Sequence, residues 1–229
     1  MKEYGYEKFT QEWNKKTVEI ALKAAESSDR EIAVAGSVST SGSWDKLTIS
    51  EIKPGFTEQL KILSDSGVNL IILEAMTSKD ETVETIIECS YKINLPVWLS
   101  ISCAFDKDNG NLMHGYQESI KNSKAYFFND FKKSISKFSK MHKGPILIAH
   151  SDIKVTNDAV KILKKNHSGI VGAYPNNGYF EKPHWKFIDN VSPSSYLDEA
   201  KSWVLNGAQI IGGCCGIGPD KIKAISFLK

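Results

Sequence analysis

The sequence Gln209-Ile210-Ile211-Gly212-Gly213-Cys214-Cys215-Gly216-Ile217-Gly218-Pro219 places two adjacent thiols on a glycine-rich turn. The apolar residues before the glycines predict a short buried strand. Pro219 and the following Asp220 are typical of the first turn of a helix. In parallel α/β proteins, chemistry is done at the carboxyl ends of strands. The residue types leave two interpretations open, a metal-binding thiol pair or two small residues packed beside glycines.

The rest of the chain predicts strands and helices in strict alternation. The expected strands are residues 31–39, 68–74, 95–102, 145–150, 169–173 and 209–211. The expected helices are residues 9–28, 56–66, 79–92, 129–141, 156–165, 195–206 and the segment from 219 to the C-terminus. Such alternation indicates a parallel sheet with right-handed crossovers. No linker or repeat interrupts it, so we expect one domain, 1–229.

Composition restricts the class of protein. The chain has 229 residues, 41% of them hydrophobic, and a net charge of +2. These values are ordinary for a globular domain and show no nucleic-acid or membrane footprint. No apolar stretch approaches a membrane span, and residues 1–7 lack the apolar core of a signal peptide. We therefore expect a cytoplasmic protein, in which four cysteines serve as metal ligands or free thiols.

Polar or reactive residues lie at or near the end of every predicted strand. They are Ser37, Glu74, Ser102 with Cys103, His150 with Ser151, Tyr174 with Asn176, and Cys214 with Cys215. A βα barrel brings all its strand ends to one rim, so this convergence favours a barrel over an open sheet. A closed barrel of that kind needs eight strands, and the pattern predicts about six.

A catalytic zinc site needs three protein ligands and one open position. Cys214 and Cys215 supply two, and His150 is the best candidate for the third because imidazole suits zinc. The alternative for His150 is a hydrogen-bonded histidine at the rim. Glu74 ends an apolar strand and could bind a substrate ammonium group or form a structural ion pair. The turn 174–178 could bind a substrate carboxylate or simply cap itself.

The remaining cysteines and histidines suggest no metal cluster. Cys89 lies inside a predicted helix and is expected in the core. Cys103 lies just past a strand end, where packing is favoured over a role in the site. The four other histidines are interpreted as surface or loop residues: His114, His142, His167 and His184.

Several motifs occur together in one order. Gly212–Gly216, followed by Gly218–Ile222, resembles the C-terminal zinc signature of the homocysteine S-methyltransferase family. Val34–Val38 resembles that family's valine-alanine-glycine-serine strand, and Leu73–Met76 its strand-end glutamate motif. Tyr174–Gly178 resembles its tyrosine-proline-asparagine-X-glycine turn. The resemblance covers essentially the whole chain.

The resemblance implies a fold and an activity. Family members are (β/α)8 TIM barrels that transfer a methyl group to the sulfur of homocysteine, giving methionine. Their zinc, held by three cysteines, binds that sulfur as a thiolate, the nucleophilic form. The donor differs among members and includes S-methylmethionine, S-adenosylmethionine and betaine. By resemblance, the substrate contacts of this chain are Glu74, which holds the amino group, with Ser37, Tyr174 and Asn176.

Two departures from the family pattern stand out. The family's first zinc cysteine follows an asparagine, and the aligned pair here is His150-Ser151. Either His150 replaces the missing ligand, which is the favoured interpretation, or the metal is weakly held or absent. The family's opening aspartate-glycine-glycine strand and its second strand are also missing. At about 30 residues per strand-helix unit, roughly 60 residues are absent. We therefore expect an incomplete barrel, truncated at its N-terminus and open to self-association. The rival interpretation is a non-catalytic barrel fragment that binds an amino acid or a partner chain.

Overall fold

A computed structural model describes residues 5–40, 47–117, 125–181, 184–186 and 191–228. Its centre is a six-stranded parallel sheet with the order β1-β2-β3-β7-β8-β11. These strands are β1 (Ala35–Ser39), β2 (Leu70–Met76), β3 (Val97–Ile101), β7 (Ile146–Asp152), β8 (Val171–Asn176) and β11 (Ile210–Ile211). The order never reverses along the chain, which distinguishes this sheet from doubly wound folds.

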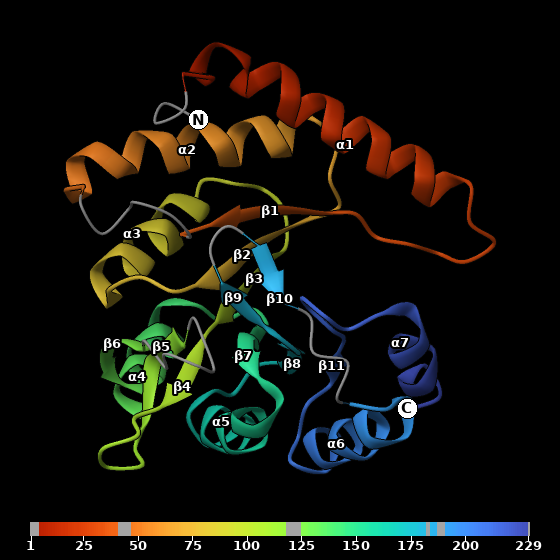
Figure 1. Cartoon of the computed structure of the whole chain (residues 1–229). Coiled ribbons are helices and arrows are strands. Elements are labelled where there is room, and N and C mark those ends of the chain that lie inside the picture. The colour runs from red at the N-terminus through yellow and green to blue at the C-terminus, as the bar shows by residue number, and fades with distance from the viewer. Residues whose placement is uncertain (1–4, 41–46, 118–124, 182–183, 187–190, 229) are drawn as a thin grey trace.

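Seven α-helices lie around the strands in the described residues (Figure 1). They are α1 (Thr10–Glu26), α2 (Ile49–Asp65), α3 (Asp80–Ser90), α4 (Phe131–Met141), α5 (Ile153–Asn166), α6 (Pro193–Leu205) and α7 (Pro219–Ile225), with a short 3-10 turn, Glu7–Phe9, before α1. Helices α1 and α2 lie side by side at one end of the sheet, and α6 and α7 at the other (Figure 1). None of the helices in the described part of the chain combines the length and apolar character that a bilayer span requires.

The helices cover the outer face of the sheet. One row of paired residues crosses five strands there, and none of its side chains is exposed: Val38, Leu73, Leu99, Ile146 and Val171. The opposite, inner face is less covered. Ser37 is exposed there, and Ile72 and Trp98 are half-buried. Side chains alternate between faces along a strand, so Glu74 lies on the same inner face as Ile72.

The predicted alternation is confirmed, with additions. Helix α2 begins at Ile49 rather than Phe56, because Thr48 and Glu51 form a capping box that starts it. Pro54 and Gly55 break the sequence pattern inside that helix, which hid its first turns. Two antiparallel sheets were not predicted. They are β4 (Cys103–Phe105), β5 (Leu112–Gln117) and β6 (Ala125–Asp130), and the pair β9 (Tyr179–Glu181) and β10 (His184–Lys186).

Strands β2 and β7 carry matching irregularities near their carboxyl ends. The register shifts between Leu73 and Met76 in one and between Ala149 and Asp152 in the other. Ala75 and His150 each adopt φ of 46° there, and they are the non-glycine residues with positive φ in the described residues. Left-handed backbone is costly for such residues and often marks functional positions. Both turns lie at the edge where the sequence predicted the site.

Candidate functional site

Glu74 is the centre of a hydrogen-bonded group that joins three strands. Its Oε1 accepts from the hydroxyl of Tyr174 at 2.8 Å and from that of Ser100 at 3.3 Å. Burial raises the pKa of Glu74, and the hydrogen bonds from Tyr174, Ser100 and the Ala75 backbone only partly offset it. Both side-chain hydrogen bonds end on Oε1, so in the described residues no side chain donates to Oε2. A cationic group placed at Oε2 would lower the pKa of Glu74 and so favour the ionised carboxylate.

Tyr174 serves as a donor in this group. Burial and the neighbouring charge of Glu74 both raise the pKa of its hydroxyl, so the proton stays on the tyrosine. The charge of Cys214 acts in the same direction. Tyr174 and Cys214 therefore lie within electrostatic reach of each other, although 40 residues separate them in the sequence. The strand-end carboxylate, the tyrosine and the thiol pair therefore lie together and form one candidate site.

The two thiols lie 3.9 Å apart, measured between the Sγ atoms of Cys214 and Cys215. Two thiolates that share one tetrahedral zinc, each at about 2.3 Å, are separated by roughly 3.8 Å. The pair therefore fits two ligand positions of such a metal. The turn that brings adjacent cysteines together depends on Gly216, which has φ of 79°, and on Gly213, where a Cβ would lie 2.2 Å from Ile217 Cγ2.

The thiols influence each other's ionisation. Because Cys214 donates a hydrogen bond to the sulfur of Cys215, the pKa of Cys215 is lowered, to about 7. The same hydrogen bond, together with burial and the nearby negative charge, raises the pKa of Cys214. One proton thus leaves readily, and the second leaves only when a cation compensates for it. A bound cation would favour loss of the second proton, because coordination deprotonates a thiol.

The cysteine loop is bound to the turn that follows β8. The backbone N–H of Cys214 donates to Pro175 O at 2.9 Å, and that of Asn177 donates to Cys215 O at 2.7 Å. Tyr196, on α6, donates its hydroxyl proton to Gly212 O. These contacts explain why the double-cysteine motif and the Tyr-Pro-Asn-Asn-Gly motif occur together, because each fixes the backbone of the other.

His150 lies at the same rim, on β7. Its ring is 5.9 Å from that of Tyr116, tilted by 56°. Burial lowers the pKa of His150, which favours neutral imidazole, the form that binds metals. Nevertheless, no set of three or more His, Cys, Asp or Glu side chains is arranged around a metal position in residues 5–40, 47–117, 125–181, 184–186 and 191–228. His150 as third ligand stays a prediction.

Ser151, at the position of the family's first cysteine, is turned toward β4. Its buried hydroxyl donates to Ala149 O at 2.8 Å and accepts from the N–H of Cys103 at 2.9 Å. Burial raises the pKa of Cys103 to about 12, so this thiol keeps its proton. Cys103 is therefore a packing residue here, as the sequence favoured. Cys89 is 2% exposed, which confirms its place in the core.

The other predicted substrate contacts lie at different heights along the sheet. Asn176 is buried at the end of β8. Ser37 lies in the middle of β1, and the partner of Glu74 on that strand is Ser39. Ser37 therefore lies two residues closer to the start of its strand than the level of Glu74. Both serines are on the inner face.

The sequence does not mark Ser100, and it does not show that three of the histidines are buried. Ser100 is a fully buried serine within an apolar strand, and nothing in its local pattern distinguishes it from packing. The interpretation as a surface or loop residue is wrong for His114, which lies in β5 and is 0% exposed. His142 and His167 do lie in loops, directly after α4 and α5, but they are buried, at 6% and 4% exposure. Each of the three rings contacts a backbone carbonyl through Nε2, and this hydrogen bond compensates for the burial of a polar ring. The side chain of His184 lies outside the described residues.

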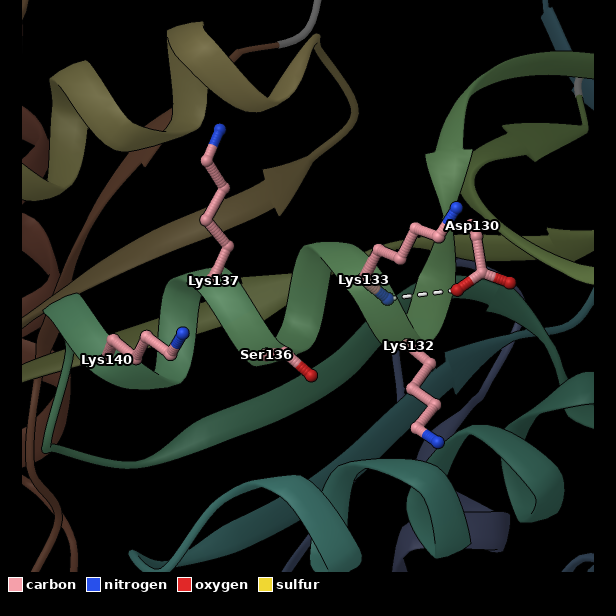
Figure 2. A pocket seen from close by; sticks show the side chains of 6 residues that line it. All are labelled: Asp130, Lys132, Lys133, Ser136, Lys137 and Lys140. Atoms are coloured by element: carbon pink, nitrogen blue, oxygen red, sulfur yellow. Dashed lines mark hydrogen bonds between the residues drawn. The ribbon is translucent and has the colours of Figure 1, made fainter.

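Two surface hollows lie away from this site, along α4 and the end of α5. One, of about 520 Å³, is lined by Asp130, Ser136 and four lysines of α4. Figure 2 shows these lysines spread along the helix, and the side chain of Asp130 bonding the N–H of Lys133. The second, of about 560 Å³, shares Ser136 and Lys140 with it. Neither contains a predicted site residue.

The fold and this site place the chain among α/β proteins with a cysteine pair and a carboxylate at their strand ends. The family model described as homocysteine S-methyltransferase matches residues 1–227. The chain belongs to the homocysteine S-methyltransferase family.

Curated relatives agree with this assignment. A selenocysteine methyltransferase of Astragalus bisulcatus is 26% identical over 213 residues, which cover 86% of this chain and 58% of the relative. Homocysteine S-methyltransferase 2 of Zea mays is 26% identical over 239 residues, covering 92% of this chain and 66% of the relative. The chain thus spans less than two thirds of the length of each of these two relatives.

Solved structures show the same fold. The Escherichia coli homocysteine methyltransferase MmuM in its apo form is 18% identical, with a TM-score of 0.66, covering 94% of this chain and 72% of that one. The metallated form of MmuM gives a TM-score of 0.67 and 19% identity, covering 94% and 69%. At this identity the likeness concerns the arrangement of the backbone.

Proposed function

We propose that this chain carries the thiol-methylating site of a homocysteine S-methyltransferase, and that it acts on homocysteine or a related thiol. The observation that carries the proposal is the thiol pair, 3.9 Å apart, beside a strand-end carboxylate in a member of this family. The products are the methylated thiol and the demethylated donor. A donor such as S-methylmethionine, S-adenosylmethionine or betaine supplies the methyl group.

Zinc is the proposed metal, bound by Cys214, Cys215 and His150. When bound, it supplies positive charge that keeps a substrate thiol ionised at neutral pH. The donor set supports zinc, because thiolates and neutral imidazole are ligands it prefers. The chain's residues orient the rest of the substrate. Glu74 receives the amino group at Oε2 while Tyr174 and Ser100 hold Oε1 in place. The turn at Asn176 and the inner-face Ser37 lie along the remainder of the substrate.

We further propose that the six strands are part of a (β/α)8 barrel with two strands missing. The strand order runs in sequence without reversal, and the helices lie around the strands (Figure 1). The partly covered inner face supports this arrangement, because a closed barrel would fill it with side chains. The TM-score of 0.66 over 94% of the chain agrees with it.

The test combines metal content with turnover. The purified protein is assayed for zinc and for methionine formation from homocysteine with each of the three donors. We expect about one zinc per chain, lost in the Cys214→Ala, Cys215→Ala double variant together with activity. The variant Cys89→Ala, at a core cysteine outside the site, is the matched control and should keep both. Wild-type protein that neither contains nor takes up zinc would refute the metal assignment. Homocysteine binding without turnover would favour the binding-only interpretation.

A further inference from the structure

The backbone turn that carries Glu74 is held at nearly every peptide group. The N–H of Ala75 donates to Ser100 Oγ at 2.8 Å. Thr40 bridges the turn, since its Oγ1 donates to Ala75 O at 3.4 Å and accepts from the N–H of Thr77 at 3.0 Å. The turn needs this support because Ala75 has φ of 46°, which an alanine adopts only when its surroundings impose it.

His114 supplies the remaining contact, to the carbonyl of Met76. Its Nε2 lies 3.1 Å from Met76 O, and the same carbonyl also accepts from Ser102 Oγ at 3.2 Å. His114 is fully buried and comes from β5, a strand of the antiparallel sheet that follows β3. The rings of His114 and Phe138 form a T-shaped pair, with 5.6 Å between their centroids. The backbone N–H of Ser102 also donates to this carbonyl, at 3.5 Å. Loss of His114 would therefore remove the shortest of three contacts to Met76 O and the one that comes from outside the parallel sheet.

Asp80 fixes the orientation of the His114 ring. Its Oδ1 lies 2.8 Å from Nδ1 of His114, and Ser134 of α4 donates to both of its oxygens, at 2.9 and 3.1 Å. Burial acts to raise the pKa of Asp80, but its interactions with His114, Ser134 and Asn129 together outweigh burial and lower it. Asp80 is thus an ionised acceptor, which orients the imidazole much as a carboxylate orients a histidine behind a metal site.

We propose that His114 is a positioning residue for Glu74. Together with Asp80 it holds the Met76 carbonyl, keeps Ala75 in its left-handed conformation, and so aims the Glu74 carboxylate at the substrate's amino group. The inference rests on the proposed function of Glu74 as the ammonium-binding residue. The proposal also gives the antiparallel sheet a part in recognition of the amino group, because His114 belongs to β5. Ser134, which bonds Asp80, adds a contact from α4.

The role has a specific signature in binding. A misaimed Glu74 weakens binding of thiols that carry an amino group and leaves thiols that lack it unaffected. A merely structural His114 would weaken both to the same extent. The measurement is calorimetric titration of the protein with homocysteine and with its analogue lacking the amino group. The ratio of the two dissociation constants is the readout.

The variants are His114→Phe, which keeps a ring and removes the donor, and His114→Gln, whose amide can restore a donor. We expect His114→Phe to weaken homocysteine binding about tenfold and to change binding of the amino-free analogue less than twofold. His114→Gln should recover part of the loss. The matched control is His167→Phe, which removes a buried histidine bonded to Gly144 O at 3.0 Å beyond the opposite end of the strands and should leave the ratio unchanged. If His114→Phe fails to fold, Thr40→Val removes the other support of the turn and should change the ratio in the same direction.

Glu74→Gln separates the two ideas. If it changes the ratio and neither His114→Phe nor Thr40→Val does, the proposed role of Glu74 stands and the positioning role of His114 is overturned. If Glu74→Gln leaves the ratio unchanged, the proposed role of Glu74 fails, and the positioning role fails with it. Adding His114→Phe to Glu74→Gln should cause no further loss in the ratio, because both act on one contact.

Discussion

At Glu74, burial and hydrogen bonding act against each other on a single carboxyl group. Burial raises its pKa, and three hydrogen bonds pull it back only in part. Between the ordinary pKa and the raised one, the folded state binds more protons than the unfolded state. The free energy of unfolding therefore falls as pH rises through that window and stays lower above it. The ionised carboxylate is a cost that the fold carries at neutral pH.

Glu74→Gln should remove this cost. The amide keeps an oxygen for the hydroxyls of Tyr174 and Ser100 and does not titrate. We expect the variant to be more stable than wild type at pH 8 and close to it near pH 4, as measured by thermal unfolding at both values. The exposed Glu58→Gln is the control and should change stability by less than about 0.5 kcal/mol at either pH. An equal shift at both pH values would contradict the argument.

The two glycines before the thiols offer a second comparison. A Cβ at Gly213 would lie 2.2 Å from Ile217 Cγ2 and 2.5 Å from its Cβ, so the turn must shift. A Cβ at Gly212 would lie 3.4 Å from Tyr174 Cβ, an ordinary contact. Gly213→Ala is expected to lower stability by about 1–3 kcal/mol, and Gly212→Ala by less than about 1 kcal/mol. Thermal unfolding checks the order. Equal losses would mean that the turn relaxes freely.

Single residues could be predicted where a motif marks them. Glu74, Tyr174, Cys214 and Cys215 lie together as their strand-end positions suggested, because parallel strands end at one edge. Ser100 and His114 could not be predicted. Their roles depend on partners 26 and 38 residues away, and a local window contains no sign of such contacts. A lone polar residue in an apolar strand is the one available signal, and it is weak.

At the scale of elements, the turns after α4 and α5 share one arrangement, a buried histidine that contacts a backbone carbonyl. His142 and His167 each follow the last residue of a helix, and a glycine follows each two positions later. Nε2 of His142 faces Pro145 O at 3.3 Å, and that of His167 faces Gly144 O at 3.0 Å. Burial lowers the pKa of both rings. The folded state therefore favours neutral imidazole in both turns.

The two buried histidines make the free energy of unfolding decrease in mild acid. Because the folded pKa values lie below the unfolded value near 6.5, the unfolded state binds more protons as pH falls below 6.5. Stability is full above that pH and is lost as pH falls toward the folded values. In the double variant His142→Gln, His167→Gln, the change in melting temperature between pH 7.5 and 5.5 should be smaller than in wild type. An unchanged pH dependence would show that neither turn titrates on unfolding.

The elements that the sequence missed are short and antiparallel. Strand β4 has three residues, and Gly115 in β5 has φ of 149° where the pairing with β6 shifts register. Such strands show neither an apolar run nor clean alternation, so they are read as loop. The long parallel strands were predicted from their apolar runs, and the helices from apolar residues at helical spacing.

At the scale of the whole molecule, the candidate site joins central strands, which pair on both sides, to an edge strand, which pairs on one side in the described residues. Glu74 and Tyr174 belong to β2 and β8, each of which has two neighbouring strands. The thiols follow β11, a two-residue strand that pairs with β8 alone in the described chain. A short edge strand opens more easily than central strands. The cysteine loop therefore depends on its backbone bonds to the β8 turn, and any metal bound there would add to them.

Hydrogen exchange would detect this dependence. If the thiols bind zinc, zinc at 100 times its dissociation constant adds about 2.7 kcal/mol to the folded state. We expect exchange to slow most in residues 210–217 and in the turn after β8. The two segments are joined by hydrogen bonds from Asn177 N–H to Cys215 O and from Cys214 N–H to Pro175 O. Strand β1, at the other edge of the sheet, is the internal reference and should change little in local opening. The double variant Cys214→Ser, Cys215→Ser should show no slowing with zinc. Equal slowing in β1 and in the cysteine loop, or slowing that survives in the double variant, would place the metal elsewhere.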